Sequence, residues 1–184
     1  VPTGFLQLEE AVKFEIKNVK DYDKDKDGDF IKEVIIKNEQ PTGTIKLDKT
    51  ISVREDADIS LIDTSDLSGI EFKLSAKENI IDMSDGSVIY EKGQEIKKYN
   101  LTKDGKLEIT NLPIGTYEIE ETKTLNGLVL NTTKYEVKFE QKDLTTKVYT
   151  EKLDISNDTT LVEFSKTDIT GDKELKGAKL SVLD

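Results

Sequence analysis

The chain has 184 residues, a formal net charge of −11, and neither histidine nor cysteine. The acidic balance argues against nucleic acid or an anionic membrane as a partner of this segment, because both require basic patches. The missing residue types exclude a Ser-His-Asp triad, thiolate chemistry, disulfides and zinc ribbons, and we expect no cofactor. The first residues do not form a signal peptide, so we expect an internal piece of a longer protein.

Short segments of alternating apolar and polar residues follow one another, separated by turn-forming residues. Such alternation is typical of strands with one buried face, and no segment of useful length has helical periodicity. The pattern predicts an all-β sandwich. The expected strands contain residues 12–16, 30–38, 44–50, 70–74, 87–90, 95–101, 107–110, 117–121, 135–139, 148–157 and 160–168.

An internal repeat relates the two ends of the chain. The segment VIIKN followed by GTIKLDKT is similar to LDISN followed by TLVEFSKTD, so that Asn38 corresponds to Asn157 and Lys49 to Lys166. One complete unit therefore lies between parts of two neighbouring copies. We expect the C-terminal part of a preceding domain at 1–41, a complete domain at 42–160 and the N-terminal part of a following domain at 161–184.

Three polar residues fall at positions where the alternation predicts a buried side chain. Lys49 shares the parity of Ile45 and Leu47, Glu121 shares that of Tyr117, and Asn157 ends the strand at 148–157. Burial favours the neutral forms of an amine and of a carboxylic acid. A neutral Lys49 amine could attack the side-chain carbonyl carbon of Asn157, while Glu121 transfers protons and ammonia leaves. The parity favours Lys49 over Lys46, which faces the other way.

The stretch Tyr-x-Ile-x-Glu-Thr at 117–122, followed by Gly127, resembles the "E-box" of CnaB-type, or SpaA-like, domains in Gram-positive pilins and adhesin stalks. Lys-Thr-Asp at 166–168 with Leu-x-Gly-Ala at 175–178 is similar to the opening strand and following loop of that family. The resemblance covers essentially the whole chain. It departs from the family pattern at Thr124-Leu125, where Ala-Pro is usual, and at Leu128, where Tyr is usual.

This resemblance implies a prealbumin-like sandwich with an intramolecular isopeptide bond. The bond would join Lys49 to Asn157, with Glu121 as the catalytic residue. By the same correspondence Asn38 and Lys166 are orphan bond residues of the neighbouring domains, whose partners we expect outside residues 1–184.

Two alternatives remain open for the three polar residues. They could form a buried, hydrogen-bonded salt bridge without covalent chemistry, or a strand register shifted by one residue could turn one of them outward. A separate alternative concerns Asp23, Asp25 and Asp27, which copy the first half of an EF-hand calcium loop. Val34 stands where that loop needs glutamate, so a solvated acidic turn is favoured over a metal site.

The favoured function is a stalk segment of a bacterial surface adhesin or pilin, extracellular and anchored to a Gram-positive cell wall. Its partners are neighbouring repeats of the same chain, with host extracellular matrix bound through another region. The alternative is an adhesin module that binds a host protein or glycan directly, through an aromatic surface formed by residues 51–66 and 78–98. A turnover enzyme is poorly supported, since histidine, cysteine and a paired acid site are all missing.

Overall fold

The computed structural model describes residues 1–15, 22–31, 33–53, 63–160, 171 and 177. Every regular element in these residues is a β-strand, and none is a helix that could cross a membrane. The strands are β1 (Asp23–Lys24), β2 (Phe30–Ile31), β3 (Thr42–Ser52), β4 (Glu71–Ala76), β5 (Ile80–Ile81), β6 (Val88–Tyr90), β7 (Glu95–Asn100), β8 (Lys106–Pro113), β9 (Gly115–Lys123), β10 (Lys134–Phe139) and β11 (Val148–Asp158).

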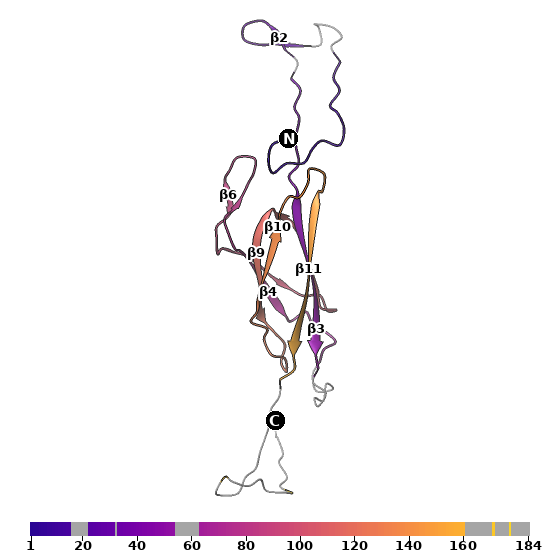
Figure 1. The fold of residues 1–184 in the computed structure, drawn as a ribbon, viewed down its shortest axis with the longest axis vertical. Coiled ribbons are helices and arrows are strands. Elements are labelled where there is room, and N and C mark those ends of the chain that lie inside the picture. The colour runs from indigo at the N-terminus through magenta and orange to yellow at the C-terminus, as the bar shows by residue number, and fades with distance from the viewer. Residues whose placement is uncertain (16–21, 32, 54–62, 161–170, 172–176, 178–184) are drawn as a thin grey trace.

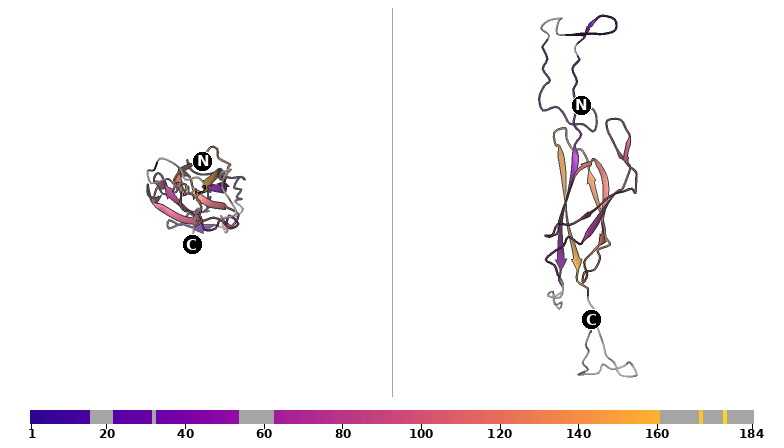
Figure 2. Two further views of the ribbon diagram at one scale, coloured as in Figure 1. Left: turned by 90° about the horizontal axis from the view of Figure 1, so that it is seen from below. Right: turned by 180° about the vertical axis from the view of Figure 1, so that it is seen from behind.

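Two sheets face each other and enclose the core (Figures 1 and 2). One sheet has the order β10-β9-β4-β7 and is antiparallel throughout, while the other has the order β11-β3-β8. Two small hairpins, β1-β2 and β5-β6, lie outside these sheets. The arrangement confirms the predicted β-sandwich.

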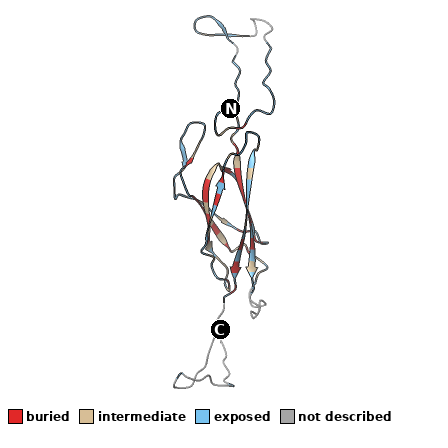
Figure 3. Ribbon diagram, viewed as in Figure 1, coloured by how far each residue is buried: buried red, intermediate tan, exposed pale blue. Residues whose placement is uncertain are grey.

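Alternation along much of the long strands separates core from solvent (Figure 3). In β3 the side chains of Ile45, Leu47 and Lys49 are buried, whereas the residues between them are exposed. In β9 the buried set continues from Tyr117 through Ile119 to the residue at position 121. Because successive side chains of a strand point to opposite faces, a polar residue at the next inward position must enter the core.

The first and last strands of the sandwich lie side by side and run in the same direction. β3 and β11 pair in parallel over their full lengths, from Thr42 opposite Val148 to Ser52 opposite Asp158. The chain therefore enters the sandwich at one end of its long axis and leaves at the other (Figure 1).

A turn at Pro113–Gly115 takes the chain from one sheet to the other. β8 ends at Pro113 and β9 begins at Gly115, yet the two strands belong to different sheets. The hydroxyl of Tyr117 donates a hydrogen bond of 2.6 Å to the Pro113 carbonyl and holds this corner. Burial raises the pKa of the Tyr117 hydroxyl, so it remains a donor.

Two predicted strands near the N-terminus are corrected by the structure. The strand expected at 30–38 is wrong beyond Ile31, because Val34, Ile35 and Ile36 are exposed and belong to no sheet. The described part of the segment expected at 12–16 is also outside any sheet, with Val12 and Phe14 exposed. Alternation produces a buried face only where a second layer covers it. The strand expected at 160–168 lies almost wholly outside the described residues.

Candidate functional site

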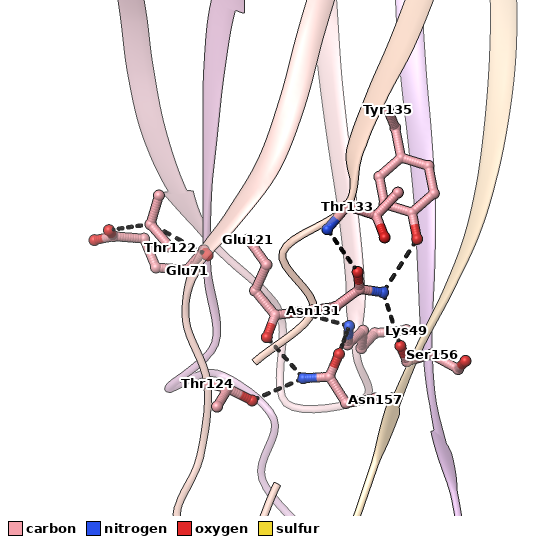
Figure 4. A network of polar contacts seen from close by, with 10 residues as sticks. All are labelled: Lys49, Glu71, Glu121, Thr122, Thr124, Asn131, Thr133, Tyr135, Ser156 and Asn157. Carbon is pink, nitrogen blue, oxygen red and sulfur yellow. Dashed lines mark hydrogen bonds and ion pairs between the residues drawn. The ribbon is translucent and has the colours of Figure 1, made fainter. Parts of the chain in front are cut away.

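Three side chains from three different strands meet inside the sandwich (Figure 4). Lys49 comes from β3 and Asn157 from the neighbouring β11, while Glu121 projects from β9 in the opposite sheet. The Lys49 Nζ atom lies 2.6 Å from Glu121 Oε2 and 2.5 Å from Asn157 Oδ1. Asn157 Nδ2 donates to Glu121 Oε1 at 2.7 Å. The three residues form a closed ring of hydrogen bonds.

This cluster is withdrawn from solvent. The exposed fractions of the Lys49 and Glu121 side chains are 0% and 1%, and Asn157 is 1% exposed as a whole residue. Desolvation lowers the pKa of the Lys49 amine, although the hydrogen bond and negative charge of Glu121 partly oppose this effect. The centroid of the Phe72 ring lies 5.4 Å from Lys49 Nζ. The ring borders the site with apolar surface, and its face attracts a cation.

The backbone of Lys49 is held by the loop that precedes β8. Its N–H donates to the Gly105 carbonyl at 2.7 Å. Gly105 has a φ of +77°, and a Cβ atom there would lie 2.9 Å from the Lys49 carbonyl oxygen. The loop can approach the strand this closely only because residue 105 has no side chain.

Asn157 and its neighbour Ser156 are contacted by two residues that the sequence did not single out for this role. Thr124 Oγ1 accepts a second hydrogen bond from Asn157 Nδ2, at 2.8 Å. Asn131 Nδ2 donates to the Ser156 carbonyl at 3.0 Å and to the Tyr135 hydroxyl at 3.1 Å. The sequence contained a clue to Thr124, since this residue places a hydroxyl group where alanine is usual in the E-box turn. It contained no clue to Asn131, because the contact of that residue depends on how the chain returns towards β11.

One carboxylate contacts both nitrogens that an amide exchange would involve. Glu121 Oε2 accepts from the Lys49 amine, and Glu121 Oε1 accepts from the Asn157 amide. A carboxyl group in this position can take a proton from one nitrogen and deliver a proton to the other. The side chain of Lys46, by contrast, points outward and lies 3.3 Å from Glu108.

Asn38, one of the two orphan residues, stands apart from this cluster. Asn38 is partly buried in the extended segment before β3, and Lys166 lies outside the described residues. Of the candidate calcium ligands, Asp23 lies in β1, while Asp25 and Asp27 lie in the tight turn between β1 and β2. There Asp25 Oδ1 accepts the N–H groups of Asp27 and Asp29, both at 2.9 Å, and the described residues contain no acidic cluster suited to a metal.

The segment at 78–98 does not form an aromatic surface. It folds into the β5-β6 hairpin, and a cavity of about 270 Å³ lies at the base of this hairpin. The residues that line this cavity include Met83, Ile81, Ile114 and Pro41. None of the described lining residues is aromatic. The part of the expected surface at 54–62 lies outside the described residues.

The sequence profile of the SpaA prealbumin-like fold domain matches residues 57–153. The matched region contains Glu121 and excludes both Lys49 and Asn157. No curated protein sequence is significantly similar to the chain.

Several solved structures of bacterial proteins are similar to the chain. The Bacillus anthracis TIE protein is 22% identical over 67% of this chain and 18% of its own, with a TM-score of 0.45. GBS52, the minor pilin of Streptococcus agalactiae, is 20% identical over 70% and 49%, with a TM-score of 0.45. The major pilin SpaA of Corynebacterium diphtheriae is 19% identical over 64% and 31%, also with a TM-score of 0.45. The chain thus spans less than two thirds of each of these proteins.

Proposed function

The chain belongs to the SpaA family of prealbumin-like fold domains, and from that premise we propose that it is a stalk segment of a bacterial surface protein, closed by an isopeptide bond between Lys49 and Asn157. The segment is extracellular and belongs to a pilin or adhesin of a Gram-positive cell wall. Residues 1–41 and 161–184 are parts of neighbouring repeats, and these repeats are its partners. The reaction occurs once within each chain, so the domain is not a turnover enzyme.

The observation that carries this proposal is the double contact of Glu121. Its two oxygens lie 2.6 Å from the Lys49 amine and 2.7 Å from the Asn157 amide nitrogen. A salt bridge alone would need only the first contact. The second places a proton carrier at the atom that must leave as ammonia.

The reaction follows from these contacts. Glu121 takes a proton from the Lys49 ammonium, and the neutral amine attacks Cγ of Asn157. The carboxyl group then protonates Nδ2 and accepts the remaining excess proton from the attacking nitrogen. The C–Nδ2 bond breaks, ammonia leaves, and an Nζ–Cγ amide bond remains. Packing supplies the proximity that makes this amide exchange fast.

Thr124 and Phe72 assist in different ways. The Thr124 hydroxyl accepts from Asn157 Nδ2 and keeps the amide plane turned towards Lys49. The Phe72 ring excludes water from one side of the amine. A dry site strengthens every charge interaction that stabilises the developing oxyanion and ammonium.

The position of the bond suits a stalk. It would tie the first strand of the sandwich to the last, close to where the chain leaves the domain. Tension along the chain would pass from β3 through the bond into Asp158 and avoid the rest of the sandwich. The bond also constrains the unfolded chain in the way that a disulfide does, which suits an extracellular domain without cysteine.

The intact mass of the 184-residue chain tests the proposal. The wild-type protein should be lighter than its sequence by one ammonia, whereas the Glu121→Ala and Asn157→Ala variants should have their full sequence masses. Lys46→Ala is the matched control, because this lysine lies on the same strand and faces solvent. A folded wild-type protein of full sequence mass would reduce the cluster to a buried salt bridge and would overturn the proposal.

A further inference from the structure

Two turns far apart in the chain have the same backbone geometry. In the first, the Phe5 N–H donates to the Pro2 carbonyl at 3.3 Å, and Gly4 has a φ of +88°. In the second, the Leu128 N–H donates to the Leu125 carbonyl at 3.2 Å, and Gly127 has a φ of +82°. Both are β-turns with glycine at the third position, where a positive φ is required.

The hydrogen bonds that follow the turns also correspond. Two residues after Gly4, the Leu6 N–H donates to the Glu39 carbonyl at 2.8 Å. Two residues after Gly127, the Val129 N–H donates to the Asp158 carbonyl, also at 2.8 Å. Glu39 directly follows Asn38, just as Asp158 directly follows Asn157. Residues 1–6 and 38–39 therefore repeat the turn and the first bridging hydrogen bond found at the closing end of the complete unit.

These residues, 1–6 and 38–39, are called the copied end here, and they pack against the sandwich. Gln141, after β10, holds the first turn with both ends of its amide group. Its Oε1 accepts from the Gly4 N–H at 3.2 Å, and its Nε2 donates to the Phe5 carbonyl at 3.0 Å. The next contact is a backbone hydrogen bond of 2.8 Å from the Gln7 N–H to the Leu144 carbonyl.

Further contacts surround this pair of hydrogen bonds. Gly4 packs so closely on Met83 that a Cβ atom at Gly4 would lie 2.6 Å from the Met83 side chain. Leu6 is buried, with 4% of its surface exposed. Charged and polar pairs complete the contact at its edge, namely Lys147 with Glu9 (2.8 Å), Lys147 with Glu39 (3.7 Å) and Gln40 with Asp82 (3.0 Å).

We propose that the end of the sandwich bearing Gln141 is a joint that receives the closing turn of the preceding repeat and holds the two repeats in one orientation. The inference rests on the tandem arrangement in the proposed function and adds a specific contact to it. The amide of Gln141 contacts backbone atoms alone, so these two hydrogen bonds do not depend on the side chains of the turn, but residue 4 must be glycine to fit against Met83.

The opposite end of the complete unit carries the matching half of such a joint. The bridge between Leu128 and Thr159 uses the Gly127 carbonyl and the Val129 N–H. It leaves the Gly127 N–H and the Leu128 carbonyl outside the hydrogen bonds made by the described part of the chain. These two atoms correspond to the Gly4 N–H and the Phe5 carbonyl that Gln141 binds. The following repeat would bind them in the same way.

Amide hydrogen exchange of the 184-residue chain, followed by NMR, tests the joint. The Gly4 and Gln7 amides bond across it, whereas the Leu6 amide bonds within the copied end and is an internal control. In the wild type all three should be protected. In Gln141→Ala the Gly4 and Gln7 amides should exchange about an order of magnitude faster, as expected for lost net hydrogen bonds, while Leu6 is unchanged. Lys142→Ala, the neighbouring substitution, should match the wild type.

Unprotected Gly4 and Gln7 amides in the wild type would overturn the joint, and so would unchanged protection in Gln141→Ala. The intact mass separates this result from the proposed function. A chain that has lost one ammonia but shows no protection at Gly4 and Gln7 would have the cross-link without the joint. Protected amides in a chain of full mass would show the joint without the cross-link.

Discussion

Lys49 and Asn157 lie on adjacent parallel strands but are not opposite each other. Lys49 pairs with Ile155, and Asn157 pairs with Ile51. The lysine side chain reaches along the strand direction and brings Nζ to 2.5 Å from Asn157 Oδ1. The offset matches the length of the lysine side chain, so an amide bond between them can form without shifting the register of the two strands.

A cross-linked domain should not lengthen under tension. Lys49 and Asn157 are 108 positions apart in the sequence. In single-molecule pulling of the 184-residue chain, the segment between them should not extend in the wild-type protein. Asn157→Ala should release roughly 360 Å when the sandwich unfolds, at about 3.3–3.6 Å per residue. Lys46→Ala should behave as the wild type does. Equal extension of the wild type and Asn157→Ala would contradict the cross-link.

Thr124→Val should slow bond formation without preventing it. Valine keeps the shape of threonine but cannot accept the hydrogen bond from Asn157 Nδ2, so the amide nitrogen loses one of its two acceptors. We expect a rate about fivefold to tenfold lower, which corresponds to one net hydrogen bond. The measurement is a time course of intact mass after cell-free synthesis.

Thr122→Val is the matched control for this substitution. Thr122 lies on the same segment but donates to Glu71, outside the cluster. Equal rates for the two variants would show that Thr124 does not orient the amide.

Gly105→Ala should destabilise the domain more than Gly86→Ala. The two glycines have nearly the same φ, +77° and +76°, so both substitutions carry a backbone cost of about 1–2 kcal/mol. Gly86 has open space around it, whereas a Cβ at Gly105 would press on Lys49 and Leu67. The contact should add about 1–3 kcal/mol to the loss in the free energy of unfolding. Denaturant unfolding in an Asn157→Ala background measures this difference without the cross-link.

A matching effect on intact mass is expected in the wild-type background. Displacement of Lys49 should leave part of the Gly105→Ala protein with its full sequence mass, while Gly86→Ala should lose ammonia completely. Equal free energies of unfolding for the two variants would show that the loop does not support Lys49.

Asp143 should titrate at an unusually low pH. Hydrogen bonds from the Thr146 hydroxyl, and then from the Thr146 and Thr145 N–H groups, lower its pKa to about 2. Folding therefore favours the carboxylate. This contribution to stability is present above the ordinary value near 3.8 and is lost as pH falls through about 2.

NMR titration of the Asp143 carboxyl carbon gives this midpoint directly. The Thr145 and Thr146 amides should shift with the same midpoint, and Asp143→Ala should abolish the transition at both. A midpoint near 3.8 would contradict the turn geometry around Asp143.

The inward faces of β3, β9 and β11 could be predicted from the sequence because burial parity is a local property. Lys49, Glu121 and Asn157 were identified in this way, each from apolar neighbours two residues away. Thr124 and Asn131 could not be identified, since their contacts depend on how the chain turns between β9 and β11. The same alternation gave a wrong prediction at Val34 and Ile36, where no second layer covers the segment in the described structure and no strand forms.

The parallel pairing of β3 with β11 determines how far this sandwich advances the chain along its long axis. An antiparallel pair would return the chain to the end at which it entered, and a row of such domains would gain little height. Here the exit lies a full strand away from the entry. The 11 residues of β3 correspond to about 36 Å at roughly 3.3 Å per residue. In the proposed tandem arrangement each repeat would be a spacer with a set step, and the number of repeats would set the distance from the base of the stalk to its tip.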